Sequence, residues 1–303
     1  MNENEADKLS SQAFDFYNQG QYVKAIELIS SILNHYPGHW DFLKFRFELY
    51  TRNNEFENAI KDLNELMEMN PGDAGFINNK IAISYQLYLE YFQEREFHKA
   101  LTNLNVCLNL DSSNPLYYIN RSALLIEMED YKSAIEAIKK EYSITKSFET
   151  LANLAQNQLN YFVKMKSENN LIDKDGLKIL ESAFTNFSLV LSDEEYITKC
   201  SDDNSAKENL FLRRGICRYF QSTIHRDSIS KSDDIYINDA VSDFNKAIAI
   251  NPNSDGALYR LAQCQAVKLN YKLAIETINR SLLINPTSKT YQELKDFIIS
   301  KLI

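Results

Sequence analysis

The chain has 303 residues, of which 44% are hydrophobic and 25% are charged, and its formal net charge is −9. The length exceeds one ordinary globular domain, and the acidic balance disfavours a nucleic-acid partner, which requires a basic face. Only 7 glycines and 5 prolines interrupt the chain, and this shortage favours helices throughout.

The start of the chain and its cysteines bear on location and cofactors. Residues Met1 to Lys8 are polar and acidic, so we expect no secretory signal. No apolar run approaches the length of a membrane span, so no membrane partner is expected. None of the 4 cysteines belongs to a Cys-x-x-Cys pair, which argues against a metal or a disulfide. We therefore predict a cytoplasmic protein with no cofactor and no bound metal.

An alanine recurs at one phase of a repeating pattern along the chain. Three of the gaps between successive alanines are 34 residues long, and two pairs of prolines keep the same spacing. A fixed period of this size indicates an array of one small structural unit. The alanines are Ala25, Ala59, Ala100, Ala134, Ala240 and Ala274, and the proline pairs are Pro37 with Pro71 and Pro252 with Pro286.

The second unit shows what each repeat contains. Apolar residues from Trp40 to Tyr50 recur at steps of three and four, as on one face of a helix. Asn53 and Asn54 mark a turn, and a second apolar stripe runs from Phe56 to Leu66. Each unit therefore predicts two amphipathic helices joined by a tight turn, with the small alanine where the two helices approach closely.

These units resemble the tetratricopeptide repeat family. The segment from Gly20 to Pro37 fits the family's pattern of a small residue, an aromatic residue, an alanine and a closing proline, and so does the segment from Tyr271 to Pro286. Residues 116–137 are the closest single match. The resemblance covers nearly the whole chain. It implies an all-α fold, a right-handed superhelix (an α-solenoid) of about seven helix pairs plus a C-terminal capping helix.

We expect residues 1–303 to form a single array. The third unit opens seven residues late, and the units of residues 148–207 and 208–254 are enlarged by about sixteen and thirteen residues. Residues 288–303 carry one apolar stripe and are expected to cap the last pair, because an open last unit would leave an apolar face in water. The units start near Ala6, Trp40, Ile81, Pro115, Phe148, Glu208 and Asp255.

Three polar segments lack the apolar stripes of the repeat. We expect them to be mobile. They are Lys166–Asp175, Ser192–Ser205 and Arg226–Tyr236.

The resemblance also implies a groove, because the first helices of this family line the inner wall. Three amides in succession there would pair with an extended peptide backbone of any sequence. Two arginines at the same phase of successive units would hold an acidic group. The candidate groove residues are Phe45, Gln86, Asn120, Asn153, Arg213 and Arg260, with Tyr259 beside them.

Each groove feature has a plainer alternative. The amides fit ordinary solvated helix surface equally well. The two arginines are equally consistent with internal ion pairs to Glu208 or Asp255. Aromatic residues on or near groove-facing phases favour peptide side chains, although most aromatics of this repeat belong to the core. These residues are Phe14, Tyr17, Phe92, Tyr219, Phe220 and Tyr259.

The sequence thus predicts a non-enzymatic scaffold or adaptor that binds an extended peptide or a partner segment carrying an acidic group. A second hypothesis is a co-chaperone that binds the tails of heat-shock chaperones through a carboxylate clamp. Asn120 fits the middle asparagine of that clamp, but Ser84, Tyr88, Glu149 and Asn153 stand where its other residues are required. A third is a catalytic or sensing site in the enlarged units, although no nucleotide, zinc or nucleophile motif marks one.

Overall fold

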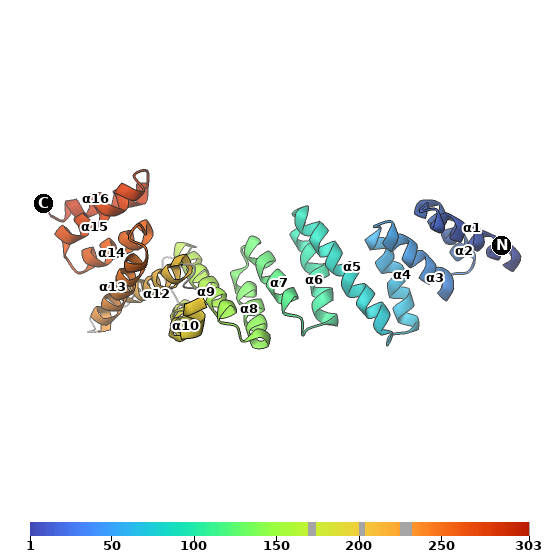
Figure 1. Cartoon of the computed structure of the whole chain (residues 1–303), viewed down its shortest axis with the longest axis horizontal. Coiled ribbons are helices and arrows are strands. Elements are labelled where there is room, and N and C mark those ends of the chain that lie inside the picture. The colour runs from blue at the N-terminus through green and yellow to red at the C-terminus, as the bar shows by residue number, and fades with distance from the viewer. Residues whose placement is uncertain (169–173, 200–203, 225–231, 303) are drawn as a thin grey trace. The chain divides into compact units, whose positions relative to one another are not determined.

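The computed structural model describes residues 1–168, 174–199, 204–224 and 232–302. These residues form sixteen α-helices and no β-strand, which confirms the all-α class (Figure 1). None of the described helices is both long and apolar enough to cross a lipid bilayer. The helices are α1 (Glu3–Asn18), α2 (Tyr22–His35), α3 (Trp40–Arg52), α4 (Phe56–Met69), α5 (Ala74–Gln93), α6 (Phe97–Leu110), α7 (Pro115–Glu127), α8 (Tyr131–Thr145), α9 (Phe148–Glu168), α10 (Lys174–Ser192), α11 (Glu194–Lys199), α12 (Asn204–Ile224), α13 (Ser232–Ile250), α14 (Asp255–Val267), α15 (Tyr271–Ile284) and α16 (Lys289–Ser300).

The chain divides into two compact units, Met1–Met128 with α1 to α7 and Glu129–Ile303 with α8 to α16. In the first unit α1 packs on α2, α3 on α4 and α5 on α6, and the second helix of each pair packs on the next helix. The second unit repeats this order with the pairs α9–α10, α12–α13 and α14–α15, and α16 packs on α15. The boundary lies between α7 and α8, within the predicted fourth unit.

The six periodic alanines are completely buried, each with 0% of its surface exposed. They lie on the second helix of their pairs, where large residues of both helices complete the core. This is the position predicted for them, because only a small side chain lets two helix backbones approach closely. The period in the sequence is therefore a packing requirement of the helix pair.

A left-handed residue closes the turn inside most pairs. It lies five positions before the buried alanine in five of the repeats, with φ between 58° and 72°. Glycine adopts this conformation without strain and asparagine with little, whereas other residues are disfavoured there. The five residues are Gly20, Asn54, Arg95, Glu129 and Leu269. The sequence marked only the first two as turn formers, so three repeats keep the turn geometry without its preferred residue.

A buried ion pair joins the two helices of two separate repeats. Arg46 of α3 donates two hydrogen bonds to Asp62 of α4, at 2.8 and 2.6 Å. Arg214 of α12 does the same to Asp243 of α13, at 2.8 and 2.7 Å. The partners are 16 residues apart in the first pair and 29 in the second. The difference of thirteen residues equals the surplus predicted for the sixth unit, so α12 and α13 are equivalent to α3 and α4.

The structure differs from the sequence prediction where the units are enlarged. Helix α5 begins at Ala74 rather than near Ile81, because Asp73 caps it by accepting hydrogen bonds from the backbone N–H groups of Gly75 and Phe76. The surplus residues of the later units lengthen α9, α10, α12 and α13 to between 19 and 21 residues.

The three segments predicted to be mobile are partly helical. Lys166 lies in the last turn of α9, and residues 194–199 form α11. Residues 169–173, 200–203 and 225–231 of these segments lie outside the described residues. In the last helix, Ile298 is buried and Tyr291 and Leu294 are half-buried, as expected. Leu302 lies on the same stripe by its spacing in the sequence, but it follows the end of α16 and is 46% exposed.

Candidate peptide-binding site

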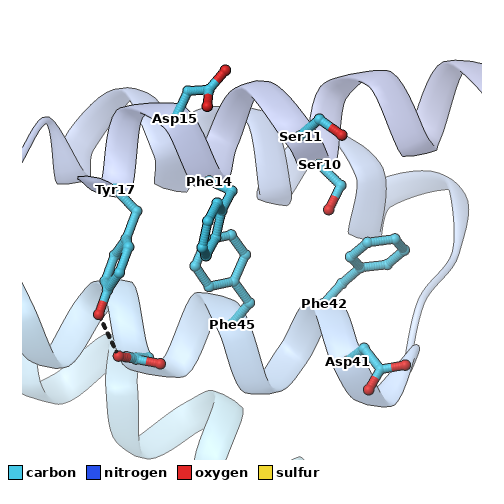
Figure 2. Close-up of a pocket in the computed structure, with 9 residues that line it drawn as sticks. Ser10, Ser11, Phe14, Asp15, Tyr17, Asp41, Phe42 and Phe45 are labelled. Atoms are coloured by element: carbon cyan, nitrogen blue, oxygen red, sulfur yellow. Dashed lines mark hydrogen bonds between the residues drawn. The ribbon is translucent and has the colours of Figure 1, made fainter. Parts of the chain in front are cut away.

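Phe45 joins an aromatic cluster between the first helices of the first two pairs. Its ring centroid lies 6.3 Å from that of Phe14 and 5.8 Å from that of Tyr17, both on α1. The Tyr17 hydroxyl donates a hydrogen bond of 2.7 Å to Glu48 of α3, and this bond raises the pKa of Tyr17 (Figure 2). Residues of these two first helices therefore meet on one surface of the first unit.

Each of the three predicted amides has its own surroundings within its unit. Asn120 is half-buried and donates to the hydroxyl of Tyr85 at 2.9 Å. Gln86 and Asn153 are exposed, and no hydrogen bond of their side chains is present among the described residues. Two of these amides are therefore available to a ligand, and the third is held by a tyrosine that the sequence analysis did not single out.

The hydrogen bond between Asn120 and Tyr85 changes which residues of α5 occupy the positions of the carboxylate clamp. Ser84 and Tyr88, where a lysine and an asparagine would be required, are 0% and 5% exposed and belong to the core. The residue of α5 that reaches Asn120 is Tyr85, one position along from Ser84. Tyrosine carries no positive charge at neutral pH, so the clamp stays incomplete in the corrected register as well.

Arg213 and Arg260 do not form internal ion pairs among the described residues. Glu208 accepts a hydrogen bond from Asn251 instead, and Asp255 accepts from Tyr291 and from Asn285. The alternative that these acids neutralise the two arginines is therefore wrong. Arg213 is half-buried without a hydrogen-bond partner in the described chain, and burial lowers its pKa.

Arg260 instead shares an aromatic ring with a second cation. The Nζ atom of Lys166 lies 4.4 Å from the centroid of the Phe220 ring, and the Cζ atom of Arg260 lies 5.8 Å from it. Burial and the nearby charge of Arg260 both lower the pKa of Lys166. We call Lys166, Phe220 and Arg260 the cationic cluster. Its members come from three helices of the second unit: α9, α12 and α14.

The cationic cluster has no counter-charge in the described chain. The side chain of Arg260 donates to Gln263 at 2.9 Å, and neither cation has a carboxylate within ion-pair distance. Tyr259 extends the aromatic surface, since Arg260 lies 5.4 Å from its ring and the ring stacks on Tyr291 at 4.8 Å. Aromatic faces hold both cations in place, and no acid of the described residues neutralises them.

Lys166 is the member of this cluster that the sequence analysis missed. It was assigned to a mobile polar segment because it follows the last obvious apolar residues of its unit. The periodicity did contain the information, since Lys166 lies four residues after the buried Phe162 on the same helix. A long cationic side chain at such a position packs its methylene groups against the core and leaves its charge at the surface.

Comparison with known proteins identifies relatives for parts of the chain. A family model described as tetratricopeptide repeat matches residues 237–296. The Hsp70-Hsp90 organizing protein of Triticum aestivum is 24% identical over 242 residues, which are 68% of this chain and 41% of that protein. Hsp70-Hsp90 organizing protein 3 of Arabidopsis thaliana is 24% identical over 184 residues, covering 57% and 31%. The chain thus spans about two fifths or less of the length of these relatives.

Solved structures give a similar picture at low identity. YrrB, described as a TPR protein with an unusual peptide-binding site, is 17% identical, covers 77% of this chain and 97% of its own, and has a TM-score of 0.49. The C-terminal part of a TPR repeat-containing protein from Cytophaga hutchinsonii is 15% identical, covers 94% and 98%, and also has a TM-score of 0.49. Residues 237–296 thus match the tetratricopeptide repeat family directly, and the helix pairs repeated around buried alanines resemble that repeat in other described parts of the chain.

Proposed function

We propose that the chain is a scaffold that binds an extended segment of a partner protein, and that the cationic cluster holds an acidic group of that segment. A tetratricopeptide fold is suited to protein–protein interaction, because stacked repeats present an extended surface. The proposal that an acidic group of the partner is held is supported by residues of the second unit alone. In this proposal the protein acts in the cytoplasm and catalyses no reaction.

The observation that supports the proposal is that no carboxylate of the described residues pairs with Lys166 or Arg260. Burial first, and then repulsion by the nearby charge of Arg260, lower the pKa of Lys166, so both effects disfavour its charged form. A carboxylate or phosphate placed between them would reverse the repulsion and receive charge-assisted hydrogen bonds. The planar guanidinium of Arg260 suits two oxygens of one such group.

Asn153, in the same unit as the cationic cluster, would serve the backbone of the bound segment. It is exposed, and its amide offers both a donor and an acceptor. Arg213 would add a further positive charge on α12, the helix that also carries Phe220. Backbone contacts of this kind do not depend on the sequence of the partner, so the acidic group would supply most of the selectivity.

The test begins with capture of a partner by the full chain and mapping of its bound segment. Calorimetry then compares the wild type with the double variant Lys166→Gln and Arg260→Gln. We expect the affinity to fall about tenfold or more, because two charge-assisted contacts are lost. The matched control is Lys140→Gln with Lys272→Gln, which removes two exposed lysines of the same unit. Equal affinities of all three proteins would contradict the proposal.

The similarity to Hsp70-Hsp90 organizing proteins keeps a co-chaperone role as a second candidate. Its test is binding of peptides that copy the C-terminal tails of heat-shock chaperones. Because Tyr85 and the buried Ser84 replace clamp residues, we expect these tails to bind no better than the same peptides with a C-terminal amide. Binding that requires the free carboxylate and is lost in Asn120→Ala would favour the co-chaperone role instead.

A further inference from the structure

A second surface lies between α1 and α3 of the first unit. Its charge is negative, opposite to that of the cationic cluster. Residues of α1 and α3 enclose an open cavity of about 600 Å³. Figure 2 shows the rings of Phe14 and Phe45 next to each other between the two helices, with Tyr17 to one side and Phe42 to the other. We call this space the aromatic pocket. It lies wholly within the first unit and shares no residue with the cationic cluster.

The aromatic faces of this pocket are accessible to a ligand. Phe14 is 54% exposed, although a phenylalanine on a helix that packs in an array is more commonly buried. Its ring lies 6.1 Å from Tyr17 in a stacked arrangement and 6.3 Å from Phe45. Aromatic faces attract cations and flat groups, since the face of each ring is the negative part of its quadrupole.

The ionisable side chains at the pocket, apart from the tyrosine, are all acids. Asp15, Asp41 and Glu48 line it, and no lysine or arginine does so among the described residues. Glu48 accepts from Tyr17 and lies 3.9 Å from Arg52, whereas the carboxylates of Asp15 and Asp41 have no hydrogen-bond or ion-pair partner in the described chain. The pocket therefore combines exposed ring faces with two uncompensated negative charges at its rim: Figure 2 shows Asp41 beyond Phe42 at one end and Asp15 pointing from α1 away from the rings.

We propose that the aromatic pocket binds an arginine side chain of a partner peptide. A guanidinium group stacks on aromatic faces and pairs with carboxylates at its edge, so it satisfies both properties of the pocket at once. An apolar side chain would use the rings but leave the acids unpaired, and an acidic one would be repelled. The site is independent of the proposed contact with an acidic group, which involves other residues of the other unit.

The test uses the full isotope-labelled chain and short peptides with a single variable residue. One peptide carries arginine between glycine and serine residues, and the second carries citrulline, which has almost the same shape without the charge. NMR titration gives an affinity for each. We expect the arginine peptide to shift the amide signals of α1 and α3 and to bind at least about threefold more tightly than the citrulline peptide.

Variants then assign the effect to the pocket. Asp15→Asn with Asp41→Asn should weaken binding of the arginine peptide about threefold or more and leave that of the citrulline peptide unchanged. Glu27→Gln with Glu68→Gln makes the same change of net charge at exposed positions outside the pocket and should have little effect. Thermal melts confirm that each variant folds. Equal binding of the two peptides, or equal weakening by the two double variants, would overturn the proposal.

Discussion

Asp62 is almost completely buried, with 2% of its side chain exposed, and both of its oxygens accept from Arg46. A carboxylate is retained at such a depth only when its charge is matched. The same pair recurs as Arg214 with Asp243, and it links the two helices of its repeat each time. At the scale of single residues, these pairs fix one helix against the other where apolar packing alone allows sliding.

Removal of one partner should therefore destabilise the protein strongly. We expect Asp62→Ala to lower the free energy of unfolding by about 3 kcal/mol, because Arg46 would be left with an uncompensated charge. Urea denaturation measures the change. The double variant Arg46→Leu with Asp62→Leu should recover most of the loss, since both charges are then absent. A loss in Asp62→Ala no larger than in Glu68→Gln would show that the pair contributes little.

Two helical glycines differ in the space around them. A Cβ atom added at Gly215 would lie 2.7 Å from the ring of Phe244, whereas one added at Gly256 would meet its nearest neighbour, Leu212, at 3.8 Å. Gly215→Ala should therefore cost about 1–3 kcal/mol through overpacking. Gly256→Ala should stabilise by up to about 1 kcal/mol, because alanine favours a helix. Chemical denaturation distinguishes them, and opposite signs in the two variants are the expected result.

At the scale of one element, the turn inside each helix pair depends on a left-handed residue. Arg95 holds φ at 62° and has no side-chain partner among the described residues, so its conformation is strained without a compensating contact. Arg95→Gly should stabilise the protein by about 1 kcal/mol through relief of this strain. Glu94→Gly is the control, because φ at Glu94 is −75° and glycine there should destabilise. Greater stability of the control than of Arg95→Gly would refute the assignment.

The helix pairs could be predicted because their stripes and buried alanines repeat at a fixed spacing. The ends of the longer helices were harder to predict from the sequence. Residues such as Lys166 are polar and follow the last apolar residue, so composition suggests a loop while the backbone continues as helix. Capping by Asp73 extends α5 in the same way. Contacts of the groove residues, such as Tyr85 with Asn120, depend on packing between repeats, which a repeat pattern does not encode.

At the scale of the whole molecule, the chain carries two surfaces of opposite charge in two compact units. The first unit holds the acidic aromatic pocket, and the second holds the cationic cluster. A partner with both basic and acidic groups would match this distribution. Neither surface follows from the net charge of −9, which describes the chain as a whole. The proposed binding therefore depends on local arrangements of a few side chains rather than on the overall charge.

The most direct measurement of the central claim is a double-mutant cycle between Arg260 and the acidic group of a captured partner peptide. Calorimetry would give the affinities of wild type and Arg260→Gln for the native peptide and for a peptide with its acid changed to the amide. Direct contact predicts a coupling free energy of about 1 kcal/mol or more, because the two changes remove the same interaction. Additive effects, with a coupling near zero and all proteins folded, would contradict the claim that the cationic cluster holds the acidic group.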